Sequence, residues 1–338
     1  MSPRVRAVCF HVILFGVLVF ATGAALAQTA IGDVHIMPRE KPVSIAVAAY
    51  APDAGERLTA GLIRTSVDLV LVPVSITDGS HRPVIGLDQN NFQLFEGKKP
   101  QEIKHFSSED TPVSIGILVD TSGSMSYKLE RAREAVRQFC EAANPQDEFF
   151  LITFANSPRL ATDFTNRPEE VENDLLTAQS KGQTSLLDAI YMGVGKMRQA
   201  RYVRRALLIL SDGGDNHSRY SEGDVKAAIK EADVMIYAVG TYERYVSTQE
   251  ELLGPELLRS LSEITGGQAF NLTNLKELPD VTRAIGTQLR HQYMLAYQPQ
   301  SERHDGKWHK IKVKLRLPNK LQALLHVDAR AGYYSGGQ

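Results

Sequence analysis

Aspartate and hydroxyl side chains alternate in the segment Asp120-Thr121-Ser122-Gly123-Ser124. Asp120, Ser122 and Ser124 stand at every second position, and Gly123 leaves the backbone free to turn so that they converge on one point. A carboxylate with two hydroxyls is a hard oxygen ligand set of low total charge. Such a set suits Mg²⁺, which keeps some of its waters and usually takes only one or two carboxylates. The segment therefore predicts a site for a divalent cation.

Two later segments offer further oxygen ligands in matching places. Thr184 precedes a helix predicted over residues 185–201, and Asp212 follows an apolar strand predicted over 206–211. In open α/β sheets, ligands bind beyond the carboxyl ends of the strands, where Asp120 and Asp212 both stand. The candidate metal ligands are two carboxylates and three hydroxyls, with room for water and a partner oxygen: Asp120, Ser122, Ser124, Thr184 and Asp212.

The middle of the chain must position these side chains, and its pattern alternates between strand and helix. Apolar runs predict strands over residues 113–120, 149–154, 206–211 and 234–240. Amphipathic periodicity predicts helices over residues 129–143, 168–180, 185–201, 224–233, 256–265 and 278–290. This rhythm predicts an α/β fold with a doubly wound, mostly parallel Rossmann-like sheet and helices on both faces.

A β-rich segment lies on each side of that region. Residues 67–77 form an apolar, β-branched run, followed by shorter alternating runs up to residue 106. After Gln292 the period returns to that of strands, and residues 310–317 alternate as in a half-exposed strand. Each segment is too short to bury a core alone. We therefore expect the two to pair in one small β-sandwich into which the α/β domain is inserted.

The N-terminus has the layout of a secretory signal peptide. Arg4 and Arg6 precede an apolar run over residues 7–19, and Ala25-Leu26-Ala27 offers the small-residue cleavage pattern before Gln28. An uncleaved membrane anchor is the alternative, although the run is short for a membrane-spanning helix. The predicted destination is the periplasm, the cell surface or the medium. A membrane is expected only if the segment is not cleaved.

The predicted organisation begins with a signal peptide over residues 1–27 and a linker or loosely docked arm over 28–60. An N-terminal β segment over 61–109, the α/β domain over 110–291 and a C-terminal β segment over 292–338 follow. The formal net charge of −1 over 338 residues, with no basic stripe, gives no indication of nucleic-acid binding. Cys140 lies at helical spacing with Leu129, Ala132 and Val136, so we interpret it as a core residue.

The motifs DTSGS, GQTSLLDAI and LSDGGDN resemble the metal ion-dependent adhesion site (MIDAS) of von Willebrand factor A-type (VWA) domains, over residues 110–291. The flanks, at residues 67–96 and at Gly332-Tyr333-Tyr334, resemble a family of exported bacterial proteins that contain this domain. The resemblance implies direct metal contacts from Ser122, Ser124 and Thr184, and direct or water-mediated ones from Asp120 and Asp212. Gln183 departs from the pattern, since such loops often carry a second glycine there.

The resemblance implies a non-enzymatic binding or adhesion module. Its cofactor would be Mg²⁺, Mn²⁺ or Ca²⁺, and its partner a protein or other acidic ligand whose carboxylate fills the open metal position. A metal-assisted hydrolase is the alternative, with Asp215 or His217 as its base. A scaffold with a vestigial site is another. Asp188 could support the metal loop or serve only the local structure.

Other enzyme classes find no support in the sequence. An aspartic protease needs an Asp-Thr-Gly turn and a second, paired carboxylate, whereas Ser122 separates Thr121 from Gly123. Gly195-Lys196 is followed by Met197, so there is no phosphate-binding P-loop. No nucleophile-elbow motif or zinc-binding histidine spacing occurs either.

Overall fold

A mixed, mostly parallel sheet forms the centre of the protein in the computed structural model, which describes residues 69–242, 249–299 and 305–335. Its six strands follow the order β10-β9-β8-β5-β6-β7, and only β7 runs antiparallel to its neighbour. The strands are β5 (Val113–Asp120), β6 (Glu148–Phe154), β7 (Pro158–Thr165), β8 (Arg204–Ser211), β9 (Met235–Thr241) and β10 (Ala269–Leu272).

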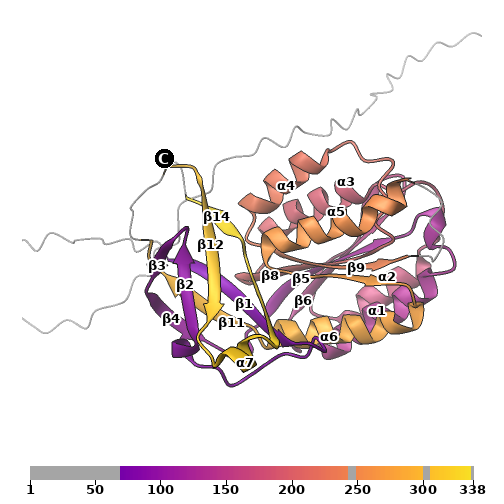
Figure 1. Ribbon diagram of the computed structural model, residues 1–338. Helices are drawn as coiled ribbons and strands as arrows, with labels where there is room; N and C mark the ends of the chain where they lie inside the picture. Colours follow the sequence, from indigo (N-terminus) through magenta and orange to yellow (C-terminus); the bar gives the residue numbers. More distant parts are fainter. Residues whose placement is uncertain (1–68, 243–248, 300–304, 336–338) are drawn as a thin grey trace, which may run out of the picture. The chain divides into compact units, whose positions relative to one another are not determined.

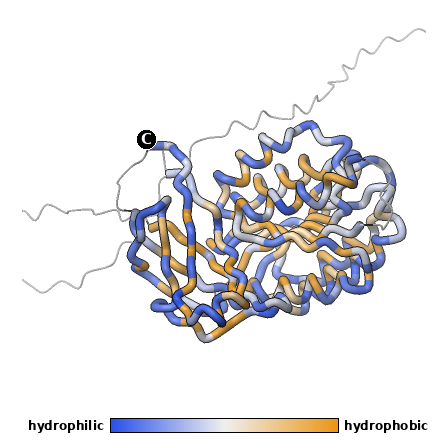
Figure 2. The backbone as a smooth tube through the Cα atoms, viewed as in Figure 1, coloured by the Kyte–Doolittle hydropathy of each residue, from blue (hydrophilic) through white to orange (hydrophobic). Residues whose placement is uncertain are grey.

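Helices cover both faces of this sheet (Figure 1). They are α1 (Leu129–Ala142), α2 (Pro168–Thr177), α3 (Leu186–Lys196), α4 (Glu222–Glu231), α5 (Gln249–Thr265) and α6 (Leu278–Arg290). α1, α2 and α6 pack in one hydrophobic core, and α3, α4 and α5 pack in another on the opposite face. Every residue of β5 is buried because both of its faces are covered. Figure 2 shows the hydrophobic residues gathered on the inner strands.

The strand order places a switch point beside the predicted metal ligands. From β5 the chain passes through α1 to β6 on one side, whereas β8 pairs with β5 on the other side. The connections at the carboxyl ends of β5 and β8 therefore diverge. In doubly wound sheets such a divergence opens the crevice in which ligands bind.

Two antiparallel sheets of four strands each form the β-sandwich, in the orders β13-β1-β11-β4 and β14-β12-β2-β3. The strands before the α/β region are β1 (Val70–Asp78), β2 (Phe92–Glu96), β3 (Lys99–Gln101) and β4 (Ile103–Ser107), and those after it are β11 (Tyr293–Tyr297), β12 (Trp308–Leu315), β13 (Leu325–Ala329) and β14 (Gly332–Tyr334). A short helix, α7 (Asn319–Gln322), joins β12 to β13. Each sheet thus mixes strands from both predicted segments.

The sandwich has its own core, to which both β segments contribute. Val72, Val74 and Ile76 of β1 pack in it with Tyr293 and Leu295 of β11. The second sheet adds alternate residues of β12, which are buried while the intervening lysines are exposed. The predicted fold class is confirmed: a Rossmann-like α/β sheet accompanied by a small β-sandwich built from N- and C-terminal segments.

Several predicted boundaries were wrong. The helix predicted over residues 256–265 begins earlier, at Gln249, and the resulting α5 includes Pro255. The helix predicted over residues 185–201 ends at Lys196, followed by a single 3₁₀ turn. β7 and β10 were missed: β7 begins at Pro158 and lacks an apolar run, and β10 has only four residues.

The predicted signal peptide, the arm and the first residues of the N-terminal β segment lie outside the described residues. Among the helices that the structure describes, none has the length and apolar character needed to cross a membrane. Cys140 is buried in the core beneath α1, as its helical spacing predicted.

Candidate functional site

Asp120 and Asp212 stand at the carboxyl ends of the two neighbouring strands β5 and β8. Asp120 is the last residue of β5 and is fully buried, while Asp212 directly follows β8 and is 3% exposed. Between them, the Ser211 hydroxyl donates to Asp120 Oδ2 over 2.6 Å. The pairing of β5 with β8 thus brings Ser211 and Asp120, which are 91 positions apart in the sequence, into direct contact, and Asp212 follows Ser211.

The loop after β5 turns its two serines toward one another. The Ser122 N–H donates to Asp120 Oδ1 over 2.8 Å, which closes a tight turn. The hydroxyls of Ser122 and Ser124 are 3.0 Å apart. Ser122 is buried, and Ser124 is exposed to solvent. Three oxygen-bearing side chains of this loop are therefore linked by hydrogen bonds, with an approach from solvent beside Ser124.

The loop that carries Thr184 is fastened to the loop after β5 and to the loop after β8. The Gly123 N–H donates to the Gly182 carbonyl over 3.0 Å. The Thr184 N–H donates to Asn216 Oδ1 over 2.9 Å, and the Thr184 carbonyl accepts from the Asn216 N–H over 3.1 Å. The backbone on both sides of the threonine hydroxyl is consequently fixed, and Thr184 itself is 5% exposed.

Gly182 has a conformational reason to be glycine. Its φ is +88°, and a Cβ there would lie 2.5 Å from Asn156 Oδ1. That same oxygen accepts the Gln183 N–H over 2.7 Å. The second glycine that the resemblance leads one to expect is thus replaced by Gln183 without loss of the turn, because Asn156 holds the backbone.

A buried lysine completes the site. Lys128 precedes α1 and is 3% exposed, and its ammonium lies 3.4 Å from Asp212 Oδ2. A shorter hydrogen bond of 3.0 Å runs from the same ammonium to the Thr241 carbonyl, at the end of β9. The lysine thus joins the beginning of α1 to the carboxyl ends of two strands.

The environment of Asp120 opposes its ionisation. Burial raises the pKa of Asp120, the nearby Asp212 carboxylate raises it further, and hydrogen bonds from Ser122 and Ser211 only partly offset this, which brings the pKa to about 7. A carboxyl that takes up a proton near neutral pH, beside a second carboxylate, is a place where a cation would relieve electrostatic repulsion.

The side chains at this edge fit a small divalent cation in their chemistry. They offer two carboxylates and three hydroxyls, all hard oxygen donors, and the serine hydroxyls lie within hydrogen-bonding distance of each other. Within residues 69–242, 249–299 and 305–335, no group of three or more His, Cys, Asp or Glu side chains gathers in a metal-binding arrangement. Any metal at this edge would therefore be held by hydroxyls as well as carboxylates.

The polar residues flanking the site have structural roles. Asp188 Oδ1 accepts the backbone N–H groups of Arg219 and Tyr220 over 2.8 and 3.0 Å, which holds the loop after β8. Asp215 accepts the Ser218 hydroxyl over 2.5 Å, and burial raises the pKa of Asp215. The backbone N–H of His217 donates to the Thr184 carbonyl over 3.0 Å. The side chains of Asp188 and Asp215 thus take part in holding the loop after β8, and His217 does so through its backbone.

Three residues of the site were not singled out from the sequence, Lys128, Asn156 and Ser211, and the contact that Asn216 makes with Thr184 was not foreseen. Ser211 was visible as the residue before Asp212, and a lysine in the amphipathic start of a helix gives no signal of burial. Asn156 and Asn216 act through side-chain contacts with a loop distant in sequence. Only the three-dimensional arrangement reveals such contacts.

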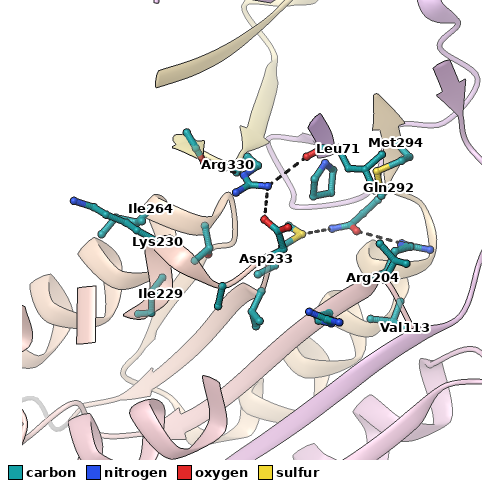
Figure 3. Close-up of a pocket in the computed structure, with 18 of the residues that line it drawn as sticks. Leu71, Val113, Arg204, Ile229, Lys230, Asp233, Ile264, Gln292, Met294 and Arg330 are labelled. Atoms are coloured by element: carbon teal, nitrogen blue, oxygen red, sulfur yellow. Dashed lines mark hydrogen bonds and ion pairs between the residues drawn. The ribbon is translucent and has the colours of Figure 1, made fainter. Parts of the chain in front are cut away.

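A pocket lies at the opposite, amino edge of the central sheet, where the sheet meets the sandwich (Figure 3). It is a small pocket, with a cavity volume of about 60 Å³. Arg330 of the sandwich forms a 2.5 Å ion pair with Asp233, and Gln292 accepts from Arg204 of β8 over 3.2 Å. Its lining is otherwise largely apolar. These polar contacts tie the sandwich to the sheet, away from the candidate metal ligands.

The region of the candidate ligands is similar to a known family of domains. Residues 115–214 match the family model of the von Willebrand factor type A domain. The matched range extends from within β5 to the loop after β8 and includes all five candidate ligands.

The chain is also similar to inter-alpha-trypsin inhibitor heavy chain H4. The bovine protein is 25% identical over 146 residues, which are 37% of this chain and 16% of the relative. The human protein is 25% identical over 135 residues, which are 35% of this chain and 14% of the relative. The matched stretch is therefore about one sixth of the length of these curated relatives.

Solved structures of similar fold include a von Willebrand factor type A protein from Catenulispora acidiphila. It is 11% identical with a TM-score of 0.47, covering 80% of this chain and 74% of that one. The BatB protein from Bacteroides thetaiotaomicron is 16% identical with a TM-score of 0.42, covering 52% of this chain and 98% of that one.

Proposed function

Starting from the von Willebrand factor type A domain at residues 115–214, we propose that this protein is a divalent-cation-dependent binding module. The bound ion would be Mg²⁺ or Mn²⁺, with Ca²⁺ as a third possibility. Its open coordination position takes a carboxylate from a protein or other acidic partner. VWA domains commonly mediate protein–protein interactions, and the metal dependence is the part that we add.

The single observation that supports the metal is the environment of Asp120. This carboxyl is fully buried, faces a second carboxylate and has hydroxyl groups as its neighbours. A purely structural turn would gain nothing from a buried carboxyl beside a second carboxylate, because that neighbour disfavours the charge on Asp120. A divalent cation that binds to both removes that penalty.

Each ligand has a distinct role in the proposal. Ser122, Ser124 and Thr184 contact the ion through their hydroxyls, and Asp120 and Asp212 bind it directly or through water. A partner carboxylate can approach from the solvent-exposed side of the loop, beside Ser124. When bound, the ion supplies positive charge and a coordination position, and the surrounding loops determine which partner fits.

The first experiment is calorimetric titration of Mg²⁺ and Mn²⁺ into metal-stripped protein, with Asp120→Ala in parallel. We expect saturable binding at one site that the variant loses. Asp174→Ala is the matched control, since Asp174 lies on α2 and accepts a hydrogen bond from the Thr162 hydroxyl of β7 over 2.6 Å. A folded wild-type protein that binds neither ion would count against the proposal and favour a vestigial site.

We also propose that the protein is exported, on the basis of its N-terminal sequence. The apolar run and the Ala25-Leu26-Ala27 pattern predict cleavage before Gln28. Mass spectrometry of protein recovered from the producing cells should find Gln28 as its first residue. An intact N-terminus would instead indicate an anchor.

A further inference from the structure

Lys128 is the one buried cation among the described residues of the site, and we propose that it makes the metal-loaded site an anion receptor. This inference rests on the proposed function. The ammonium offsets one of the two carboxylate charges, so that a divalent ion leaves the crevice with a net positive charge. The partner's carboxylate is then needed for neutrality.

The lysine is held in place by contacts with three elements. It stands just before α1, and its ammonium reaches the Asp212 carboxylate at the end of β8 and the Thr241 carbonyl at the end of β9. The side chains of Lys128 and Asp212 are both 4% exposed, so solvent screens their interaction only weakly. A displacement of this ammonium into water would leave the carboxylate of Asp212 buried without a partner.

The charge balance of the site follows from its buried groups. Asp120 and Asp212 carry two negative charges when ionised and Lys128 carries one positive charge, which leaves a single negative charge. Asp188 is the next buried carboxylate, and Arg219 balances it over 3.3 Å. A divalent cation turns the single negative charge of the site into a single positive charge. One carboxylate from a partner then makes the site neutral.

Without the ammonium the same reasoning gives a different outcome. Two carboxylates would neutralise the divalent ion completely, and a further carboxylate would bring an uncompensated negative charge into a buried crevice. Buried charges without a counter-charge are strongly disfavoured. Lys128 should therefore weaken the binding of the metal itself while strengthening the binding of an anion to the metal-loaded site.

These opposite effects provide the test. Mn²⁺ is titrated by calorimetry into metal-stripped wild type and Lys128→Met, in acetate and in chloride at equal ionic strength. We expect acetate to tighten Mn²⁺ binding by the wild type. The variant should bind Mn²⁺ about tenfold more tightly in chloride, and acetate should no longer enhance binding. Complexation of Mn²⁺ by acetate in solution affects both proteins equally.

Lys226→Met is the matched control. Lys226 lies on α4 and forms a surface ion pair with Glu222 over 2.5 Å, so its loss should leave both the Mn²⁺ affinity and the acetate effect as in the wild type. A structural role of Lys128 would weaken Mn²⁺ binding in the variant and leave any acetate effect unchanged. That result would overturn the inference.

Two further outcomes separate the inference from the proposed function. If the wild type binds no metal, the proposed function fails and the inference fails with it. If it binds Mn²⁺ but acetate has no effect, only the inference fails. Thermal unfolding with and without Mg²⁺ provides a test even if Lys128→Met is unstable. The ion should replace the lost positive charge, so Mg²⁺ should raise the melting temperature of the variant more than that of the wild type. A variant that stays unfolded at saturating Mg²⁺ would also overturn the inference.

Discussion

The hydroxyl of Ser211 donates a 2.6 Å hydrogen bond to the carboxylate of Asp120, which joins the carboxyl ends of β8 and β5. Ser211 also accepts the Gly213 N–H over 3.0 Å, so it fixes the loop after β8 at the same time. Both side chains are fully buried. Ser211 is not a candidate metal ligand, but its hydrogen bond determines the direction of one carboxylate oxygen of Asp120.

Replacement of Ser211 by Ala should therefore weaken metal binding more than it weakens the fold. Residues that orient metal ligands typically contribute about 10- to 100-fold in affinity, whereas one lost hydrogen bond costs about 1 kcal/mol of folding free energy. Calorimetry and urea unfolding measure the two effects. Ser260→Ala, which removes a hydroxyl bound only to the Leu257 carbonyl, is the control and should not alter metal affinity.

Thr184→Ala should reduce the effect of acetate on Mn²⁺ binding by a larger factor than it reduces the affinity for Mn²⁺ alone. The reason is that the Thr184 loop is hydrogen-bonded through Gly182 to Gly123, next to the exposed Ser124 beside which the proposed open position lies. The same calorimetric series measures both quantities, with Thr177→Ala as the control on α2. An equal loss of the two would rule out a special role for Thr184 in anion binding.

Gln292→Leu should destabilise the whole protein. Gln292 is 4% exposed, and its amide contacts Ser75 of β1 over 3.2 Å and Tyr237 of β9 over 3.3 Å, besides accepting from Arg204. Leucine would leave these buried polar groups with fewer partners, at a cost of about 1–3 kcal/mol. Urea unfolding monitored by circular dichroism measures the change.

Gln288→Leu is the matched control for that variant. Gln288 is 2% exposed, and in the part of the chain that the structure describes its Nε2 has no hydrogen-bond partner. Removal of an unsatisfied buried amide should leave the free energy of unfolding unchanged or raise it. If the two variants lose the same stability, the polar contacts of Gln292 do not hold the sandwich to the sheet.

The stability of the sandwich should fall as the pH rises above neutrality. His309 of β12 lies 3.0 Å from Glu96 and 3.1 Å from Asp305. Burial lowers the pKa of His309, but hydrogen bonds to Asp305 and Glu96 outweigh it, so the pKa is raised above 6.5. Because the pKa of His309 is higher in the folded than in the unfolded state, the protonated ring stabilises the folded state. This stabilisation is fully present below pH 6.5 and is lost as the pH rises through the folded-state pKa.

Chemical unfolding at a series of pH values from mildly acidic to mildly alkaline checks this expectation. His309→Gln should flatten the profile above pH 6.5, since an amide keeps the hydrogen-bonding capacity without titrating. A wild-type profile that is already flat, or a variant with the same slope, would show that the histidine contributes no pH-dependent stability.

The fold could be predicted from the sequence because its signals are local. The run Val113–Asp120 is apolar throughout, as a strand buried on both faces requires, and the structure places β5 over those eight residues. α1 likewise follows the amphipathic spacing of its residues. β7 escaped prediction because it is an antiparallel edge strand that begins with a proline and has only one buried residue.

The candidate ligands could also be predicted, because Asp120 and Asp212 each follow a strand whose end is visible in the sequence. Their arrangement in detail could not. The inward direction of Lys128 depends on its contact with the Thr241 carbonyl at the end of β9, and Asn156 reaches Gln183 across 27 residues of chain. Contacts of this kind depend on the tertiary structure and not on local pattern.

The chain enters the α/β domain from β4 and returns to the sandwich through β11, and these two strands are paired, with Ser107 opposite Met294. The α/β domain is thus an insertion whose entering and leaving strands, β4 and β11, are hydrogen-bonded to each other. Tension applied between β1 and β14 would be borne by the strand pairs of the sandwich, and the central sheet would remain unloaded until β4 and β11 separate. A pull on both ends of the sandwich would leave the geometry of the candidate cation site undisturbed.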